Sequence, residues 1–447
     1  MAEDATTIVS NISEEEKKAT LNKVVSSSFL GNFIEWFDYA SYSYFASVIG
    51  VVFFPAGDAM VTTMSAFAVF ALSFLVRPIG ALFWGNMGDK KGRKWTLSIS
   101  ILLMSGATFL IGCLPGYAMI GLGAPLLLLL LRMCQSFSAS GEYAGASTFI
   151  AEYAPDNHRG FYCSMVPAST ATGLLIGSLF ATFMFSTWGA ESAFVQNIGW
   201  RIPFWIAGPL GYITHYIRTR LSDSPVYEAM MTAVEKAGQQ HGESKPIRTL
   251  FKKHLKVTII SFGTCVLNAV GFYAVLTFMP TYLTTILNYD HVSANMVTNI
   301  CLVAYIFMIF ISGRISDKVG RKKMMLIASG GFVILTVPMF MLMGSMSFGL
   351  ILIAELVMNA LLTVNDGTLA SYLTETFPTE VRFSGFAFTF NCANAFLGGS
   401  CSYICLALTN ATGNNYAPAF YMVFIAAIAF VCMCLSHEHT GKSLSEI

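Results

Sequence analysis

Charged side chains are scarce in this chain of 447 residues. Asp, Glu, Lys and Arg make up 11% of it, whereas about 25% is usual in a soluble protein. Hydrophobic residues make up 55%, and the mean hydropathy is +0.62. So few charges could not keep a globular protein of this composition in water, and we therefore expect lipid to cover most of its surface.

Patterns of catalysis and of metal binding are missing as well. The chain has no Rossmann, P-loop, Ser-His-Asp or HExxH pattern, and its seven histidines form no catalytic cluster. The ten cysteines lie in or beside apolar runs without a Cys-x-x-Cys pair, as small packing residues do. These absences predict a protein that is not an enzyme and that has no cofactor and no metal site.

Long apolar runs fill most of the chain. Twelve of them reach or approach the roughly 20 residues that an α-helix needs to cross a bilayer. We therefore predict an all-α polytopic membrane protein with twelve transmembrane helices. The predicted spans are 24–50, 60–84, 95–114, 124–150, 161–186, 202–217, 257–286, 294–311, 324–343, 348–373, 383–408 and 417–435.

Two sequence motifs occur twice. Residues 85–94 read GNMGDKKGRK and residues 313–322 read GRISDKVGRK, an offset of 313 − 85 = 228. EYAPDNHRG and ETFPTEVRFSG form a second pair, whose prolines are 378 − 155 = 223 residues apart. Such a period indicates two equivalent six-helix halves. The predicted parts are an N-terminal tail (1–23), a first bundle (24–219), a linker (220–254), a second bundle (255–435) and a C-terminal tail (436–447).

The basic residues predict the orientation. Of the 26 Lys and Arg, only Arg77, Arg132 and Arg201 lie outside the tails and the even-numbered loops. Loops rich in Lys and Arg stay on the cytoplasmic side of a membrane. We therefore expect both termini and both copies of the decapeptide in the cytoplasm.

The duplicated pattern Gly-x-x-x-Asp-basic-x-Gly-Arg-basic resembles that of the major facilitator superfamily. The segments GNFIEWFDYASY, FLVRPIGA, GEYAGAS, AEYAPDNHRG and GWRIPF are similar to those of its metabolite:proton symporter family, which includes proline/glycine betaine, 2-oxoglutarate, citrate and shikimate importers. The resemblance extends from about residue 28 to the end of the chain. It implies the major facilitator fold, in which spans one, four, seven and ten line a central cavity.

Polar side chains follow one face of several spans. Asn32, Glu35 and Tyr39 share a stripe of span one, and Asn359 and Asp366 share one of span ten. A polar stripe on an apolar helix faces protein or water. Together with the implied architecture, this predicts a substrate cavity formed by Asn32, Trp36, Tyr39, Tyr42, Arg77, Arg132, Gln135, Tyr143, Asn268, Tyr273, Asn359, Asp366, Asn391 and Asn394.

Three acids of spans one and four are the predicted proton-coupling residues: Glu35, Asp38 and Glu142. Neighbouring acids repel each other when both are ionised, and burial disfavours the charged form. Pairing with Arg77 or Arg132 is the alternative explanation for buried charge here. Because three acids face two arginines, we expect at least one acid without a full partner. The acids of span ten are the next candidates.

The duplicated charges at the ends of spans two and eight are either solvated loop charges or parts of a gate. The resemblance implies that Asp89 and Asp317 clasp neighbouring helix termini and hold the cytoplasmic side closed in the outward-facing state. The predicted gating residues are Asp89, Arg93, Arg159, Asp317, Arg321 and Arg382.

These features predict a proton-coupled importer of a small zwitterionic or carboxylate metabolite. Proline or glycine betaine is placed ahead of dicarboxylates, tricarboxylates and shikimate, because acids outnumber arginines in the expected cavity and its aromatic residues suit a quaternary ammonium group. A non-transporting nutrient sensor is the alternative class. We expect a monomer of the bacterial inner membrane whose partners are substrate, protons and lipid, with no nucleic acid.

Overall fold

The computed structural model describes residues 14–55, 59–189, 191–224, 227–228, 231–232, 246–444 and 446. Parts of the predicted N-terminal tail (1–23) and of the predicted linker (220–254) lie outside these residues. Every regular element in the described part of the chain is a helix, which confirms the all-α fold class.

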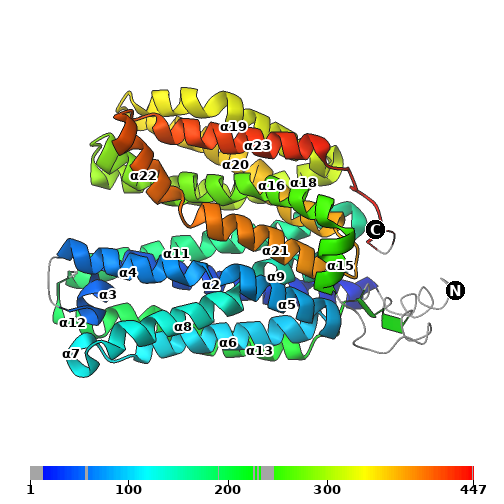
Figure 1. The fold of residues 1–447 in the computed structure, drawn as a ribbon, viewed down its shortest axis with the longest axis horizontal. Coiled ribbons are helices and arrows are strands. Elements are labelled where there is room, and N and C mark those ends of the chain that lie inside the picture. Colours follow the sequence, from blue (N-terminus) through cyan, green and yellow to red (C-terminus); the bar gives the residue numbers. More distant parts are fainter. Residues whose placement is uncertain are drawn as a thin grey trace.

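The first half of the chain forms the lower layer in Figure 1. Its long helices run side by side, and α3, α7 and α12 lie at one end of the layer. The first helix begins at Glu14, earlier than predicted. The helices are α2 (Glu14–Tyr44), α3 (Ala46–Phe53), α4 (Ala59–Phe74), α5 (Arg77–Lys91), α6 (Arg93–Cys113), α7 (Tyr117–Ile120), α8 (Gly123–Ala139), α9 (Glu142–Tyr153), α10 (Arg159–Cys163), α11 (Met165–Trp188), α12 (Ala193–Asn197) and α13 (Ile202–Thr219).

The second half forms the upper layer (Figure 1). Predicted spans seven and eleven contain π-helical segments, at Tyr273–Phe278, Tyr282–Ile286 and Asn394–Gly398. One short helix, α15, lies inside the predicted linker. The helices are α15 (Pro246–Lys253), α16 (Leu255–Phe272), α17 (Met279–Thr281), α18 (His291–Val319), α19 (Arg321–Met343), α20 (Phe348–Thr376), α21 (Arg382–Ala393), α22 (Cys401–Thr412) and α23 (Ala417–Leu435).

Nine helical stretches among the described residues are long and apolar enough to cross a membrane. They correspond to predicted spans two, three, five and seven to twelve. The predicted first, fourth and sixth spans are helical too, as α2–α3, α8–α9 and α13. These three spans carry most of the buried charges of the first half.

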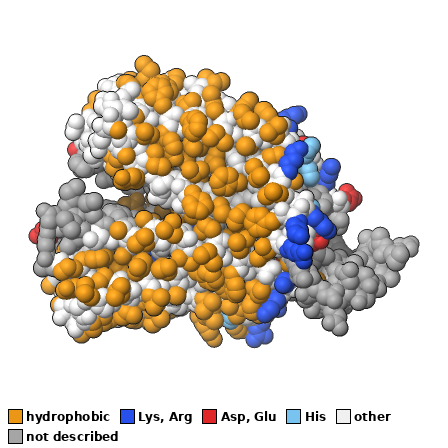
Figure 2. Space-filling view, viewed as in Figure 1, with side chains coloured by type: hydrophobic (Ala, Val, Ile, Leu, Met, Phe, Trp, Pro, Cys, Tyr) orange, Lys and Arg blue, Asp and Glu red, His pale blue; other side chains and the backbone are white. Residues whose placement is uncertain are grey.

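The surface has an apolar flank and one basic end. Figure 2 shows hydrophobic side chains over the flanks of both layers, while Lys and Arg gather at the end where both termini lie. Apolar residues such as Leu126, Phe307 and Ile334 are more than 60% exposed on these flanks. Lipid would cover such surface in a membrane protein. We call the end where Lys and Arg gather the basic end.

Each copy of the decapeptide forms the turn between two consecutive helices at the basic end. Gly92 and Gly320 end α5 and α18 with φ of 95° and 102°, a region that favours glycine. Asp223 accepts hydrogen bonds from the first backbone N–H groups of α6, at 3.0 and 3.4 Å. Glu438 accepts the equivalent bonds from α19, at 3.2 and 2.9 Å. Burial would raise the pKa of Glu438, but these bonds and one from Thr440 outweigh it and lower that pKa.

The two halves touch backbone to backbone at the basic end. A Cβ atom added at Gly160 of α10 would lie 2.7 Å from the carbonyl oxygen of Gly313 in α18, and the reverse distance is also 2.7 Å. Any side chain at either position would therefore hold the halves apart.

We expect Gly313→Val to open the basic end, because the contacting atom of Gly160 is backbone and cannot move aside. The thiol of Cys163, which is buried beside this contact, should then react faster with a maleimide. Gly106→Val is the matched control, since a Cβ atom there meets nothing within 4 Å. Unchanged protection of Cys163 in Gly313→Val would contradict the close-contact account.

Candidate functional site

A small cavity lies between the two halves. The space among its lining residues is about 260 Å³ when the part open to solvent is included. Helices α2, α9 and α11 of the first half and α16, α18, α20 and α21 of the second half contribute side chains. Five residues of the predicted cavity set lie here, and five lining residues were outside that set. The lining residues are Trp36, Tyr143, Pro167, Thr170, Asn268, Phe272, Tyr305, Asp366, Phe390 and Asn394.

Asp366 carries the one formal charge of this lining. Its carboxylate accepts hydrogen bonds from the Tyr305 hydroxyl at 2.7 Å, from Asn268 Nδ2 at 2.7 Å and from Asn365 Nδ2 at 3.0 Å. All three donors are neutral. Among the described residues no Lys, Arg or His forms a salt bridge with Asp366, so its negative charge faces the cavity uncompensated.

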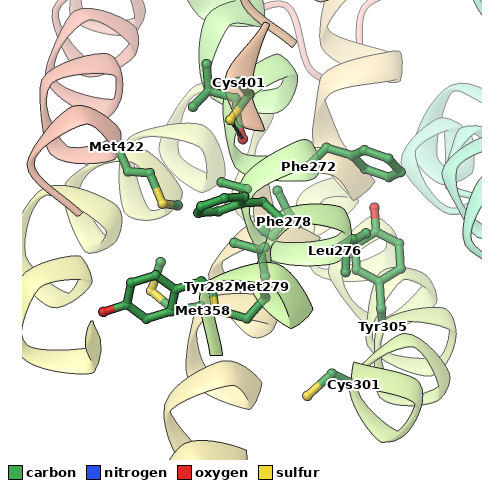
Figure 3. Packing of buried hydrophobic residues seen from close by; sticks show 14 of the residues in the cluster. Phe272, Leu276, Phe278, Met279, Tyr282, Cys301, Tyr305, Met358, Cys401 and Met422 are labelled. Carbon is green, nitrogen blue, oxygen red and sulfur yellow. Dashed lines mark hydrogen bonds between the residues drawn. The ribbon is translucent and has the colours of Figure 1, made fainter. Parts of the chain in front are cut away.

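Aromatic rings from both halves surround the cavity. Tyr143 and Phe390 stack face to face across the interface, with ring centroids 4.3 Å apart. The rings of Trp36 and Phe272 also meet across it, at 5.1 Å. Figure 3 shows Phe272 and Tyr305 on the same side of the buried hydrophobic residues that it draws, with the Tyr305 hydroxyl directed toward Phe272. These rings make the walls apolar apart from a few polar groups.

Several other predicted cavity residues join helices instead of lining this cavity. Asn32 donates hydrogen bonds to Ser169 and Thr170 of α11, both at 2.8 Å. The Asn359 amide bonds the carbonyl of Cys301 at 3.0 Å, and the Asn391 amide bonds the carbonyl of Ser140 at 2.7 Å. The Tyr42 hydroxyl bonds the carbonyl of Ala66, while the Tyr273 hydroxyl has no hydrogen-bond partner among the described residues.

The acids of spans one and four each face an arginine. Glu35 pairs with Arg77, which also bonds the Tyr39 hydroxyl at 2.7 Å. Asp38 pairs with Arg132 at 2.7 Å and with the Gln135 amide. The Arg132 guanidinium lies 4.0 Å from the centre of the Tyr42 ring.

The expectation of an acid without a full partner is wrong for these three residues. Glu142 pairs with Arg218, which binds both of its carboxylate oxygens. Arg218 lies one residue beyond the predicted end of span six at residue 217, but α13 extends to Thr219 and buries that guanidinium inside the bundle. Gly31 makes room for the pair, since a side chain there would overlap Glu142 and Arg218.

At the basic end, the duplicated aspartates cap helices of the opposite half. Asp89 accepts hydrogen bonds from the backbone N–H groups of Phe383 and Ser384, at 3.1 and 2.9 Å. Asp317 accepts them from Gly160 and Phe161, at 2.7 and 3.0 Å. Each carboxylate therefore lies at the first turn of α21 or α10, where the helix dipole favours negative charge.

Two glutamates complete the same contact. Glu152 receives Arg93 of its own half at 3.0 Å and Arg382 of the other half at 3.1 Å. Glu375 in turn receives Arg321 and Arg159, at 3.2 and 2.8 Å. We call the two sets of Asp, Glu and two Arg the charged closure. The tail adds to it, because Arg159 and Arg382 also donate to the carbonyls of residues 442 and 444.

Comparison with known proteins identifies a transporter family and similar transporters. The family model described as the Major Facilitator Superfamily matches residues 28–400. The glycine betaine/proline/ectoine/pipecolic acid transporter OusA of Dickeya dadantii is 36% identical over 95% of this chain and 85% of its own length. The proline/betaine transporter of Escherichia coli K12 has the same identity and coverage.

Solved structures show the same fold. The proton:xylose symporter XylE bound to 6-bromo-6-deoxy-D-glucose has a TM-score of 0.79, with 16% identity, over 96% of this chain and 98% of that one. The inward open conformation of XylE from E. coli has a TM-score of 0.66, with 17% identity, over 95% and 98%.

We expect Asp89→Asn to slow transport far more than it weakens substrate binding at equilibrium. The change keeps the shape of the side chain but removes a charge at a helix N-terminus, which is worth about 0.3–2 kcal/mol. The ratio of closed to open basic ends should then fall up to about 30-fold. Initial uptake into proteoliposomes and calorimetric binding measure the two effects. Glu380→Gln, an exposed acid at the same end, is the control. Normal uptake by Asp89→Asn would mean that this charge only helps to orient the chain.

Proposed function

The chain belongs to the major facilitator superfamily and is a transporter, and from this premise we propose that it imports glycine betaine or proline together with protons by alternating access. The observation that carries the substrate class is the cavity between the halves, which combines one uncompensated carboxylate with aromatic walls. The names of the relatives support the same class.

A zwitterion with a cationic head fits this cavity in charge. Asp366 would attract the ammonium group, and the faces of Trp36 and Tyr143 would contact its methyl or methylene groups, a contribution of about 0.5–2 kcal/mol. The indole N–H of Trp36 has no hydrogen-bond partner among the described residues. It is therefore a free donor for the carboxylate of the substrate.

A dicarboxylate or tricarboxylate would lack cationic partners in the same place. Neither Arg77 nor Arg132 lines the cavity, and each already pairs with an acid. Binding 2-oxoglutarate or citrate would require breaking these buried pairs, which costs about 3–5 kcal/mol each. Transport of organic acids or shikimate is therefore the second candidate.

Proton coupling is assigned to Glu35, Asp38 and Glu142. Glu35 Oε2 and Asp38 Oδ1 are buried and have no hydrogen-bond partner among the described atoms. Protonation of either acid would release its arginine for another contact as the halves move. This exchange of partners would link proton binding to the state of the cavity, because Tyr39 bonds Arg77 and packs against Trp36.

The transport cycle follows from the closure. We assign the basic end to the cytoplasm of a bacterial inner membrane, because Lys and Arg gather there. Both termini would then be cytoplasmic, and the charged closure would seal the outward-facing state. Rocking of the halves would break it and open the cavity to the cytoplasm. One chain supplies the whole cavity, which suits a monomer.

We expect Asp366→Asn to weaken glycine betaine binding about 10- to 100-fold, since an ion pair at 4 Å is worth about 4 kcal/mol at an effective dielectric of 20 before desolvation is subtracted. Competition against labelled betaine measures the loss, and Glu191→Gln on an exposed loop is the control. If 2-oxoglutarate or citrate raises the melting temperature of the unaltered protein while betaine and proline do not, the substrate class is overturned. Binding without any uptake into proteoliposomes would favour a sensor.

Neutral variants test the proton sites. We expect at least one of Glu35→Gln, Asp38→Asn and Glu142→Gln to lose accumulation driven by a pH gradient while keeping exchange of internal for external substrate. Exchange survives because it needs no net movement of the proton. Proteoliposomes with and without an imposed pH difference separate the two activities. If all three variants accumulate substrate with the pH dependence of the unaltered protein, the proton binds elsewhere.

A further inference from the structure

Glu355 is a buried acid that takes part in neither the cavity nor the charged closure. It lies in α20, 366 − 355 = 11 residues before Asp366, about 16 Å away along the helix. The residue is 0% exposed. Apart from the Thr298 hydroxyl beside it, no donor among the described residues reaches either carboxyl oxygen, and Glu355 forms no ion pair with any of them.

Two neighbours of Glu355, one on the facing helix α18 and one on α20 itself, present further oxygens. The hydroxyl of Thr298 lies beside the carboxyl group, toward which it can donate, and it has no other hydrogen-bond partner within the described chain. One turn along α20, the Asn359 amide nitrogen bonds the carbonyl of Cys301, and this leaves Asn359 Oδ1 buried without a donor. Three neighbouring side chains therefore present oxygens, and among the described residues only the Thr298 hydroxyl can donate to them.

Among the described residues, no cationic side chain faces this group of oxygens. The titratable groups of α18 here are Cys301 and, one turn further, Tyr305, whose hydroxyl is bonded to Asp366. Helix α19, which also packs against α20, has no ionisable residue between positions 324 and 343. Helix α16 approaches α20 at Asp366, where Asn268 bonds it.

An unpaired carboxylate is strongly unfavourable at such a place in a membrane, so a positive charge from outside the protein must compensate it. Hard cations prefer oxygen ligands. One carboxylate with a hydroxyl and an amide oxygen balances a single positive charge. The chemistry therefore fits a monovalent cation, either H⁺ or Na⁺.

We propose that Glu355, with Thr298 and Asn359, binds a second coupling cation that moves with the substrate in each cycle. This inference rests on the proposed function, because it adds an ion to the proton bound by the acids of the first half. A proton would sit on one carboxyl oxygen and be shared with the hydroxyl or amide oxygen. Na⁺ would be coordinated by all three side chains. Either ion enters with its charge and leaves with it, so no other group has to change its charge.

Accumulation of labelled glycine betaine against imposed gradients tests the site. We expect accumulation by Glu355→Gln to depend less steeply than accumulation by the unaltered protein on one of the two imposed differences, in pH or in Na⁺. The reason is that the variant couples one ion fewer to each substrate molecule. The gradient whose effect is lost identifies that ion. Exchange of internal for external substrate should persist, which a misfolded protein could not show. Glu191→Gln, an exposed acid of a loop, should match the unaltered protein.

The outcomes distinguish this inference from the proposed function. If the unaltered protein accumulates betaine but Glu355→Gln does so equally steeply under both gradients, the cation site is overturned and the transporter stands. If the unaltered protein responds to neither gradient, the proposed coupled transport itself fails.

A second variant covers the case in which Glu355→Gln does not fold. Thr298→Val keeps the shape of the side chain and removes one oxygen, so half-maximal uptake should need a higher concentration of the coupling ion. Infrared difference spectra of the unaltered protein should show a buried carboxyl band that changes on adding Na⁺ or on raising the pH, and that is shifted in Thr298→Val. A spectrum insensitive to both ions would contradict the proposal.

Discussion

A charge buried in a membrane protein needs a partner, and this constraint organises the whole molecule. In the first half, three acids meet three arginines, as Glu142 does with Arg218. At the basic end, two glutamates each hold an arginine from both halves, and two aspartates meet the first turns of helices across the interface. These pairs between the halves exist in the conformation in which the basic end is closed. Opening that end therefore costs the free energy of breaking them.

The exceptions to this constraint are the two acids at which we propose that the substrate and a second cation bind. Within the described part of the chain, Asp366 is held only by neutral donors, and it faces a cavity of aromatic rings, so a cationic ligand would complete its surroundings. Glu355 has no charged partner and no donor except the Thr298 hydroxyl among the described residues. In the first half, by contrast, the acids keep their arginines and could exchange them. In the function that we propose, substrate, proton and conformation are connected through the pairing of a small number of charges.

The sequence predicted the architecture well, because apolar runs and a repeat of 228 residues are local and periodic signals. The charged motifs also revealed which residues meet at the basic end. The sequence could not predict the partner of Glu142, because Arg218 lies just beyond the predicted end of span six, where nothing in the sequence shows that its side chain is buried. Asn32, Asn359 and Asn391 lie on polar stripes, but packing directs their amides to neighbouring helices instead of the cavity. The capping roles of Asp223 and Glu438 depend on contacts between distant segments, which no local pattern encodes.

The most direct test of the substrate site is a structure of the protein with glycine betaine bound. The account predicts density for the quaternary ammonium group beside Asp366, between the ring pairs of Trp36 with Phe272 and Tyr143 with Phe390. Density for the ligand beside Arg77 or Arg132, with Asp366 left in contact only with its neutral donors, would contradict it.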